Sequence, residues 1–195
     1  MHKSKEKKLK NMEKNNFIKK LLLVTALIAI AAFMRLVPHW PNLTPVAAIA
    51  LFGGATLNKK WLAILIPVSI MLISDLFIGF HDYVAAVYLS FIIAVFMGFS
   101  LSKNKKFHRI ALTSIASSIL FFIITNFAVW YGSPFYPQEI SGLMSCYAAG
   151  LPFFNDSSLG VSFFLNGIIG DMLYNFVFFG ILYLITLRYP ALAKA

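Results

Sequence analysis

The stretch Arg35-Leu-Val-Pro-His-Trp-Pro-Asn-Leu-Thr-Pro45, with the small-residue segment that follows it, decides how this chain is organised. A cation and a rigid polar turn here interrupt a strongly apolar sequence. Because charged and polar groups are costly inside a bilayer, such an interruption is the first place to look for function.

The composition is typical of a membrane protein with several crossings. Of 195 residues, 59% are hydrophobic and only 12% are charged, which is too apolar for a soluble domain. The net charge is +10, but eight of the 17 basic residues lie in the first 20 positions. We therefore predict a disordered basic cytoplasmic tail over residues 1–16, beside a membrane, rather than a nucleic-acid interface. A single cysteine, Cys146, excludes an internal disulfide and a multi-cysteine metal site.

Six apolar segments predict an all-α integral membrane protein. A helix needs about 20 residues to cross a hydrocarbon layer of ~30 Å. The segments are residues 17–37, 45–57, 61–80, 83–101, 110–131 and 161–187. We expect one membrane domain over residues 17–190 and a short cytoplasmic tail over residues 191–195.

The short second segment decides the topology. At about 1.5 Å per residue it reaches about 20 Å, so it either crosses or re-enters. If it crosses, the basic residues of the short loops all lie on the side of the basic tail; if it does not, they all lie opposite. Short cytoplasmic loops carry Lys and Arg, which favours six crossings with both termini cytoplasmic.

Local signals predict how the second segment starts and packs. Thr44 reads as the N-cap and Pro45 as the first helical residue. Ala50-x-x-x-Gly54 has the spacing that lets membrane helices approach closely.

The long outer loop contains a further predicted helix, residues 137–150. Ile140, Leu143, Met144 and Tyr147 recur at helical spacing and predict one apolar face. This amphipathic helix either lies at the membrane interface or covers an outward cavity.

Apart from Lys19 and Lys20 at the start of the first segment, three charged residues lie within the apolar segments, and each has two possible roles. Arg35 either extends its guanidinium to the outer interface or faces a pocket, where its planar fork suits a carboxylate or phosphate. Asp75 forms a buried ion pair or helix cap, or contributes to a pocket. For Asp171 we favour a pocket or a structural hydrogen bond over exposure to lipid.

The polar groups gather in the outer half of the membrane, and the inner half is comparatively plain. This asymmetry predicts an apolar, aromatic cavity that faces outward and has a few polar anchors. Arg35 favours an anionic ligand and the aromatic residues a planar one. The candidate substrate-binding residues are Arg35, His39, Trp40, Asn42, Thr44, Asp75, His81, Asn126, Trp130, Asp171 and Tyr174.

No motif for an enzyme, a metal or a cofactor is evident. The chain lacks a phosphate-binding loop, His-Glu-x-x-His and Gly-x-Ser-x-Gly, so we predict no enzymatic activity, no cofactor and no metal. An aspartyl protease that uses Asp75 and Asp171 is the enzyme alternative, although the surrounding Gly-x-x-Gly-Asp spacing departs from that of intramembrane aspartyl proteases.

Several segments carry a family resemblance. Pro41-Asn-Leu-Thr-Pro45, Ser74-Asp75, Asn126-Phe-Ala-Val-Trp130, Cys146-Tyr-Ala-Ala-Gly-Leu-Pro-Phe-Phe154 and Gly170-Asp171 resemble an uncharacterised group of bacterial membrane proteins described as transport proteins. That group is similar to the substrate-binding S components of energy-coupling factor transporters. The Ala-x-x-x-Ala coupling pattern of those proteins is absent from the first segment, where Thr25-x-x-x-Ala29 comes nearest.

The resemblance implies an S-component-like bundle in a bacterial inner membrane. It also implies a pocket for a vitamin or a related micronutrient, a coupling membrane protein and cytoplasmic ATPase subunits as partners. The function we expect is substrate binding for uptake. One alternative is a self-sufficient proton-coupled transporter, in which the membrane carboxylates would carry the protons. The other is a membrane scaffold.

Overall fold

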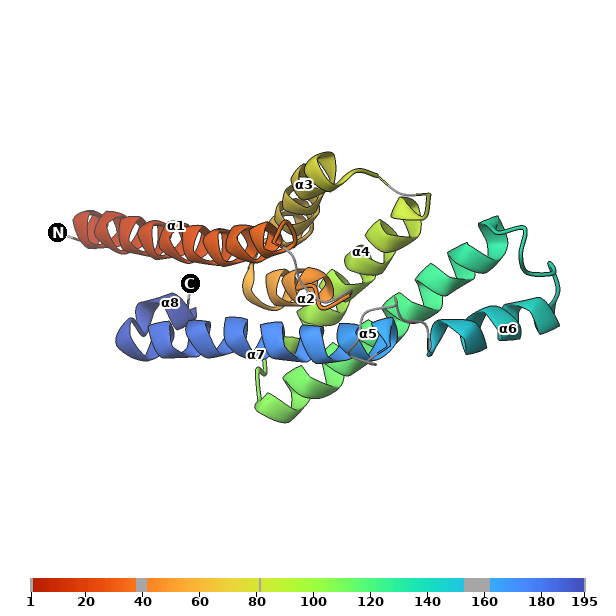
Figure 1. Cartoon of the computed structure of the whole chain (residues 1–195). Coiled ribbons are helices and arrows are strands. Elements are labelled where there is room, and N and C mark those ends of the chain that lie inside the picture. The colour runs from red at the N-terminus through yellow and green to blue at the C-terminus, as the bar shows by residue number, and fades with distance from the viewer. Residues whose placement is uncertain (1, 38–41, 81, 153–161, 195) are drawn as a thin grey trace.

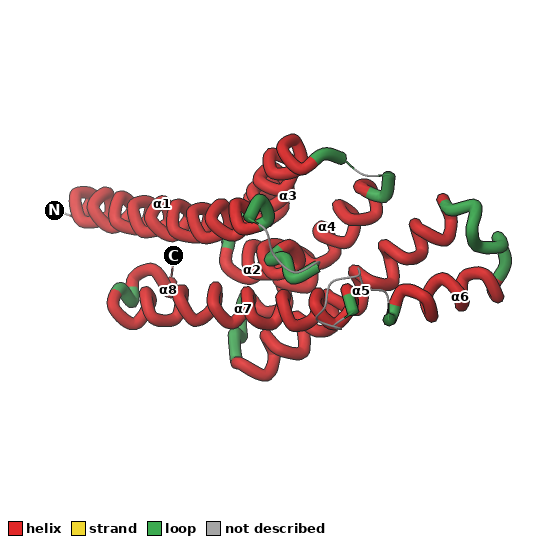
Figure 2. Tube along the Cα trace, in the orientation of Figure 1, coloured by secondary structure: helices red, strands yellow, loops and turns green. Residues whose placement is uncertain are grey.

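The computed structural model describes residues 2–37, 42–80, 82–152 and 162–194. All secondary structure in these ranges is helical, which confirms the predicted all-α class (Figure 2). The helices are α1 His2–Met34, α2 Val46–Thr56, α3 Lys60–Ile78, α4 Val84–Leu101, α5 Phe107–Gly132, α6 Ile140–Gly150, α7 Phe163–Arg188 and α8 Ala191–Lys194.

Five of these helices are long and apolar enough to cross a membrane: α1, α3, α4, α5 and α7. Much of their apolar surface faces outward, as at Leu76 and Phe77, whose side chains are 66% and 76% exposed. Soluble monomers rarely expose so much apolar surface, and contact with the lipid of a membrane explains it. The chain is therefore a multi-pass membrane protein.

The short helix α2 forms the centre of the bundle (Figure 1). Every one of its residues is buried, and it packs against α1, α3, α4, α5 and α7. At Gly54 an added Cβ would collide with the backbone carbonyl of Val95 in α4, and at Gly98 it would collide with that of Leu51. The predicted close approach at Gly54 is thus observed, and α4 is the helix that makes it.

The two ends of the molecule differ. The N-terminus, the C-terminus and α8 lie at one end, on the left in Figure 1, and α6 lies at the other. At the first end, Leu192 of α8 is buried, and α8 packs on α1 and α7. Residues 191–194, expected as a tail, thus form a short docked helix.

The predicted segments match the observed helices to within three residues at each boundary, except at the start of α1. The sequence predicts a disordered tail over residues 1–16, but α1 is helical from His2. Lys and Glu are good helix formers, and extending an existing helix is easier than nucleating one, so the apolar part of α1 propagates into the basic segment.

Candidate functional site

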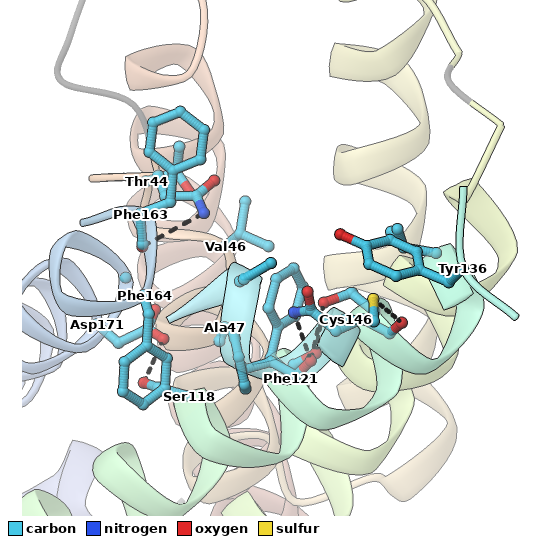
Figure 3. A pocket seen from close by; sticks show the side chains of 18 residues that line it. Thr44, Val46, Ala47, Ser118, Phe121, Tyr136, Cys146, Phe163, Phe164 and Asp171 are labelled. Atoms are coloured by element: carbon cyan, nitrogen blue, oxygen red, sulfur yellow. Dashed lines mark hydrogen bonds between the residues drawn. The ribbon is translucent and has the colours of Figure 1, made fainter. Parts of the chain in front are cut away.

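A cavity of about 340 Å³ lies among α5, α6, α7, the start of α2 and the turn that precedes α2. Figure 3 shows Asp171 and Ser118 at one side of it and Tyr136 and Cys146 at the other. Four of the predicted site residues line the cavity: Asn42, Thr44, Asn126 and Asp171.

Asp171 joins three helices at the base of the cavity. Its Oδ1 accepts a hydrogen bond from the backbone N–H of Ala48 at 3.2 Å, and its Oδ2 accepts one from the Ser118 hydroxyl at 2.7 Å. Ala48 lies in the first turn of α2, where backbone N–H groups lack partners within the helix. Asp171 of α7 therefore caps α2 and is held in place by α5. A carboxylate has about four lone-pair positions, so these two bonds leave capacity for a ligand.

The predicted capping of α2 by Thr44 is wrong. The helix begins at Val46, Pro45 is its N-cap, and no side chain of the N-cap residue caps it. Pro45 contributes the first backbone carbonyl, which accepts from Ile49 N. The cap comes instead from Asp171, which is distant in sequence. Thr44 is left at the cavity wall.

Two asparagines occupy the wall of the cavity. Asn42 has a φ of 60°, a left-handed conformation that asparagine tolerates better than most residues. Its side-chain amide donates to Phe163 O at 3.3 Å, which ties the turn before α2 to the start of α7. Asn126 donates to Phe122 O at 2.9 Å within α5. Neither of these two bonds uses the oxygen of the side-chain amide, which can accept a hydrogen bond from a ligand.

The rest of the wall is mostly aromatic and apolar. Phe122 packs against Phe164 with ring centroids 4.7 Å apart. Burial raises the pKa of the Cys146 thiol, so it lines the cavity as a neutral group at pH 7. At Gly167 an added Cβ would meet no heavy atom within 4 Å, so this face of α7 is open. Such a lining suits a small, partly planar molecule.

Helix α6 contributes part of this wall, but not through the face predicted from the sequence. It begins at Ile140 rather than Pro137, after the N-cap Glu139. Ile140 and Met144 are 78% and 57% exposed, whereas Gly142 and Cys146 are buried. Small residues stand where the space is tight: an added Cβ at Gly142 would collide with Pro137 O in the turn that leads into α6, and one at Gly150 would meet Asn126 of α5.

Arg35 and Asp75 form an ion pair apart from the cavity. Arg35 Nη1 lies 2.7 Å from Asp75 Oδ1 and also donates to Ser74 Oγ at 2.6 Å. The Tyr88 hydroxyl donates to Asp75 Oδ2 at 2.7 Å. The cluster connects α1, α3 and α4. Of the roles expected for Asp75, the structure shows the buried ion pair. The Arg35 guanidinium therefore binds a carboxylate of the protein itself.

The charge of the cavity therefore differs from the sequence expectation. Arg35 is not among the described residues that line it, and those residues include one carboxylate, Asp171, and no cation. Arg35, the residue from which an anionic ligand was expected, is thus not part of the described lining. The described lining suits a neutral or cationic molecule instead.

Two further predicted site residues, Trp130 and Tyr174, are not among the described residues that line the cavity. Trp130 Nε1 donates to Pro137 O at 2.9 Å and so supports the connection from α5 to α6. Tyr174 packs on Phe178, with centroids 6.1 Å apart, and on the core. His39, Trp40 and His81 lie outside the described residues, so their part in the site stays a prediction.

Sequence reasoning missed the polar groups of α5. Ser114, Ser117 and Ser118 are buried, and Ser114 Oγ accepts from Asn175 Nδ2 of α7 at 3.0 Å. With Asp171 and Asn175 of α7 they form a polar seam between α5 and α7 that leads away from the cavity. The spacing of these serines on one helix face was the available signal.

Comparison with known proteins gives one match. Residues 15–192 match a family described as "Family of unknown function (DUF6580)". The chain belongs to this family. No curated protein and no solved structure matches it.

The ion pair yields a test of stability. Because both side chains are largely buried, at 14% and 8% exposure, replacing one leaves the other charge uncompensated. Arg35→Met or Asp75→Leu should each cost about 3–5 kcal/mol, and the double variant should cost clearly less than their sum. Unfolding of the purified protein in detergent measures this. Additive effects would contradict the pairing, and Tyr88→Phe, which removes one hydrogen bond, should cost only about 1 kcal/mol.

Proposed function

We propose that this DUF6580 member is a membrane protein that binds a small molecule for uptake through the cavity at Asp171. The observation that carries the proposal is the lining of that cavity: aromatic walls, a few amide and hydroxyl groups and one carboxylate that already caps a helix. Its site residues are Asn42, Thr44, Asn126 and Asp171. The described lining favours a neutral or cationic, partly planar ligand, such as a vitamin or related micronutrient.

The proposal includes six crossings with both termini in the cytoplasm of a bacterial cell. The helix α2 would be the sixth crossing, and its shortness is compatible with a position wholly inside the bundle. The basic residues of the short loops then lie with the termini, and the cavity faces outward. The resemblance to S components suggests a coupling membrane protein and ATPase subunits as partners.

The separate partners of the two aspartates favour binding over proteolysis. Asp75 bonds to Arg35 and Tyr88, whereas Asp171 bonds to Ala48 and Ser118. Two aspartates with separate partners do not form the proton-sharing pair that an aspartyl protease needs. We therefore propose a binding protein without catalytic activity.

A self-sufficient transporter is the second candidate, favoured by the polar seam. Beyond Asp171, the seam includes two atoms, Ser117 Oγ and Asn175 Oδ1, that are buried without a protein partner in the described structure. Buried polar groups inside a membrane often mark proton or ion pathways. Proteoliposomes that contain this chain alone should then show uptake that Asp171→Asn abolishes; absence of flux would exclude this candidate.

The topology can be tested by labelling with a membrane-impermeant maleimide in intact cells. With Cys146 replaced by Ser, single cysteines at Asp82 and Gln138 should be labelled, and those at Asn58 and Asn104 should be protected until the cells are lysed. A re-entrant α2 would give the loops at Asn58 and Asn104 the accessibility of the outer surface, and labelling of these two positions in intact cells would refute the six-crossing arrangement.

The binding proposal can be tested by filling the cavity. Gly167→Phe places a ring in the cavity from a position where the Cβ meets nothing, so folding should survive. Small molecules that co-purify with the wild-type protein are identified by mass spectrometry, and their binding is then measured by thermal stabilisation. The variant should lose at least about tenfold in affinity, because the ring occupies the ligand's volume.

The matched control is Gly180→Phe, on the same helix and equally free of Cβ contacts, but away from this cavity. It should retain the ligand. Equal binding by wild type and Gly167→Phe, or equal loss in both variants, would contradict the assignment of the site.

A further inference from the structure

A second cavity, of about 510 Å³, lies at the opposite end of the bundle from α6. It is lined by residues of α1, α5, α7 and α8, by Thr56 at the end of α2 and by the loop between α4 and α5. This is the end at which both termini lie (Figure 1). The cavity shares no residue with the one at Asp171.

Two lysines give this cavity its charge. Lys20 of α1 and Lys105 of the α4–α5 loop both line it, and the described lining includes no aspartate or glutamate. Lys20 Nζ donates to Asn58 Oδ1 at 3.4 Å, and Lys105 Nζ donates to Ser102 O at 2.7 Å. Because two ammonium groups at one cavity repel each other, an anion between them lowers the electrostatic energy.

The rest of the cavity is apolar and suits a hydrocarbon chain. Phe107 and Phe176 stack with ring centroids 4.6 Å apart and an interplanar angle of 7°. Phe179 and Leu182 extend the apolar lining along α7. Gly180 leaves an open place there, because an added Cβ would meet nothing within 4 Å. A free inorganic anion would leave this apolar volume unused.

We propose that this second cavity binds an anionic phospholipid. The phosphate binds Lys20 and Lys105, and one acyl chain lies along Phe107, Phe176 and Phe179. The basic residues lie at the end of the membrane-crossing helices, where lipid headgroups lie, and basic pockets between helices at the cytoplasmic face are suited to such headgroups. The site is independent of the function of the cavity at Asp171.

The test is a lipid titration of the full chain in detergent, followed by native mass spectrometry. The probes are phosphatidylglycerol and phosphatidylcholine with the same acyl chains, and glycerol 3-phosphate as the headgroup alone. Phosphatidylglycerol should bind at least about tenfold more tightly than phosphatidylcholine, since each lysine near a headgroup contributes about 1 kcal/mol. Glycerol 3-phosphate should bind weakly, because it lacks the acyl chain.

The chain offers a matched control for the lysines. Lys20→Gln with Lys105→Gln should remove the preference for phosphatidylglycerol. Lys19→Gln with Lys103→Gln removes the same charge from the same segments, at residues outside the cavity lining, and should keep the preference within about twofold. Gly180→Phe should weaken binding of both lipids by filling the apolar part.

Three results would overturn the proposal. Equal loss in the two double variants would mean unspecific surface attraction, and equal binding of the two lipids would mean an apolar site without headgroup recognition. Tight binding of glycerol 3-phosphate would mean a site for a soluble phosphate compound. If the lysine variants fail to fold, unchanged lipid binding by Gly180→Phe would overturn it as well. None of these results depends on ligand binding at Asp171.

Discussion

The hydrogen bonds of Asp171 are the constraint on which the arrangement around the cavity depends. Helix α2 is short and wholly buried, so its first backbone N–H groups lie inside the bundle, where lost hydrogen bonds are costly. Asp171 accepts from Ala48 of α2 and from Ser118 of α5, and thereby fixes three helices relative to each other. The base of the cavity is the place where they meet. The carboxylate thus has a structural role and also faces the proposed ligand.

The small residues of α2 set the other side of this arrangement. Gly54 and Gly98 let α2 and α4 come into backbone contact, because side chains at either position would collide with the opposing carbonyl. The cavity lies at the other contacts of α2, where its first residues, Val46 and Ala47, line the open volume together with residues of α5, α6 and α7.

Arg35 is a charged residue in an apolar segment, but its role in the structure differs from the role expected from the sequence. From the sequence, Arg35 was expected either to reach the outer interface or to face a pocket, whereas in the structure it pairs with Asp75. Because a buried ion pair satisfies both charges, neither needs a ligand. The pair and the Tyr88 hydroxyl connect the end of α1 with α3 and α4, while the described lining of the cavity has Asp171 as its one carboxylate. The described lining therefore suits a neutral or cationic ligand rather than the anionic one expected from the sequence.

The sequence by itself determined the helical class, the helix positions and the membrane environment. These follow from apolar runs whose length must match a bilayer, which is a local property. Only the tertiary structure decided that Asp171 meets Ser118, that Arg35 meets Asp75, and that two separate cavities form. A helix that is apolar on all sides has no polar face to show which side turns inward. Its rotation, and so the partner of each buried polar group, is set by packing between segments far apart in the chain.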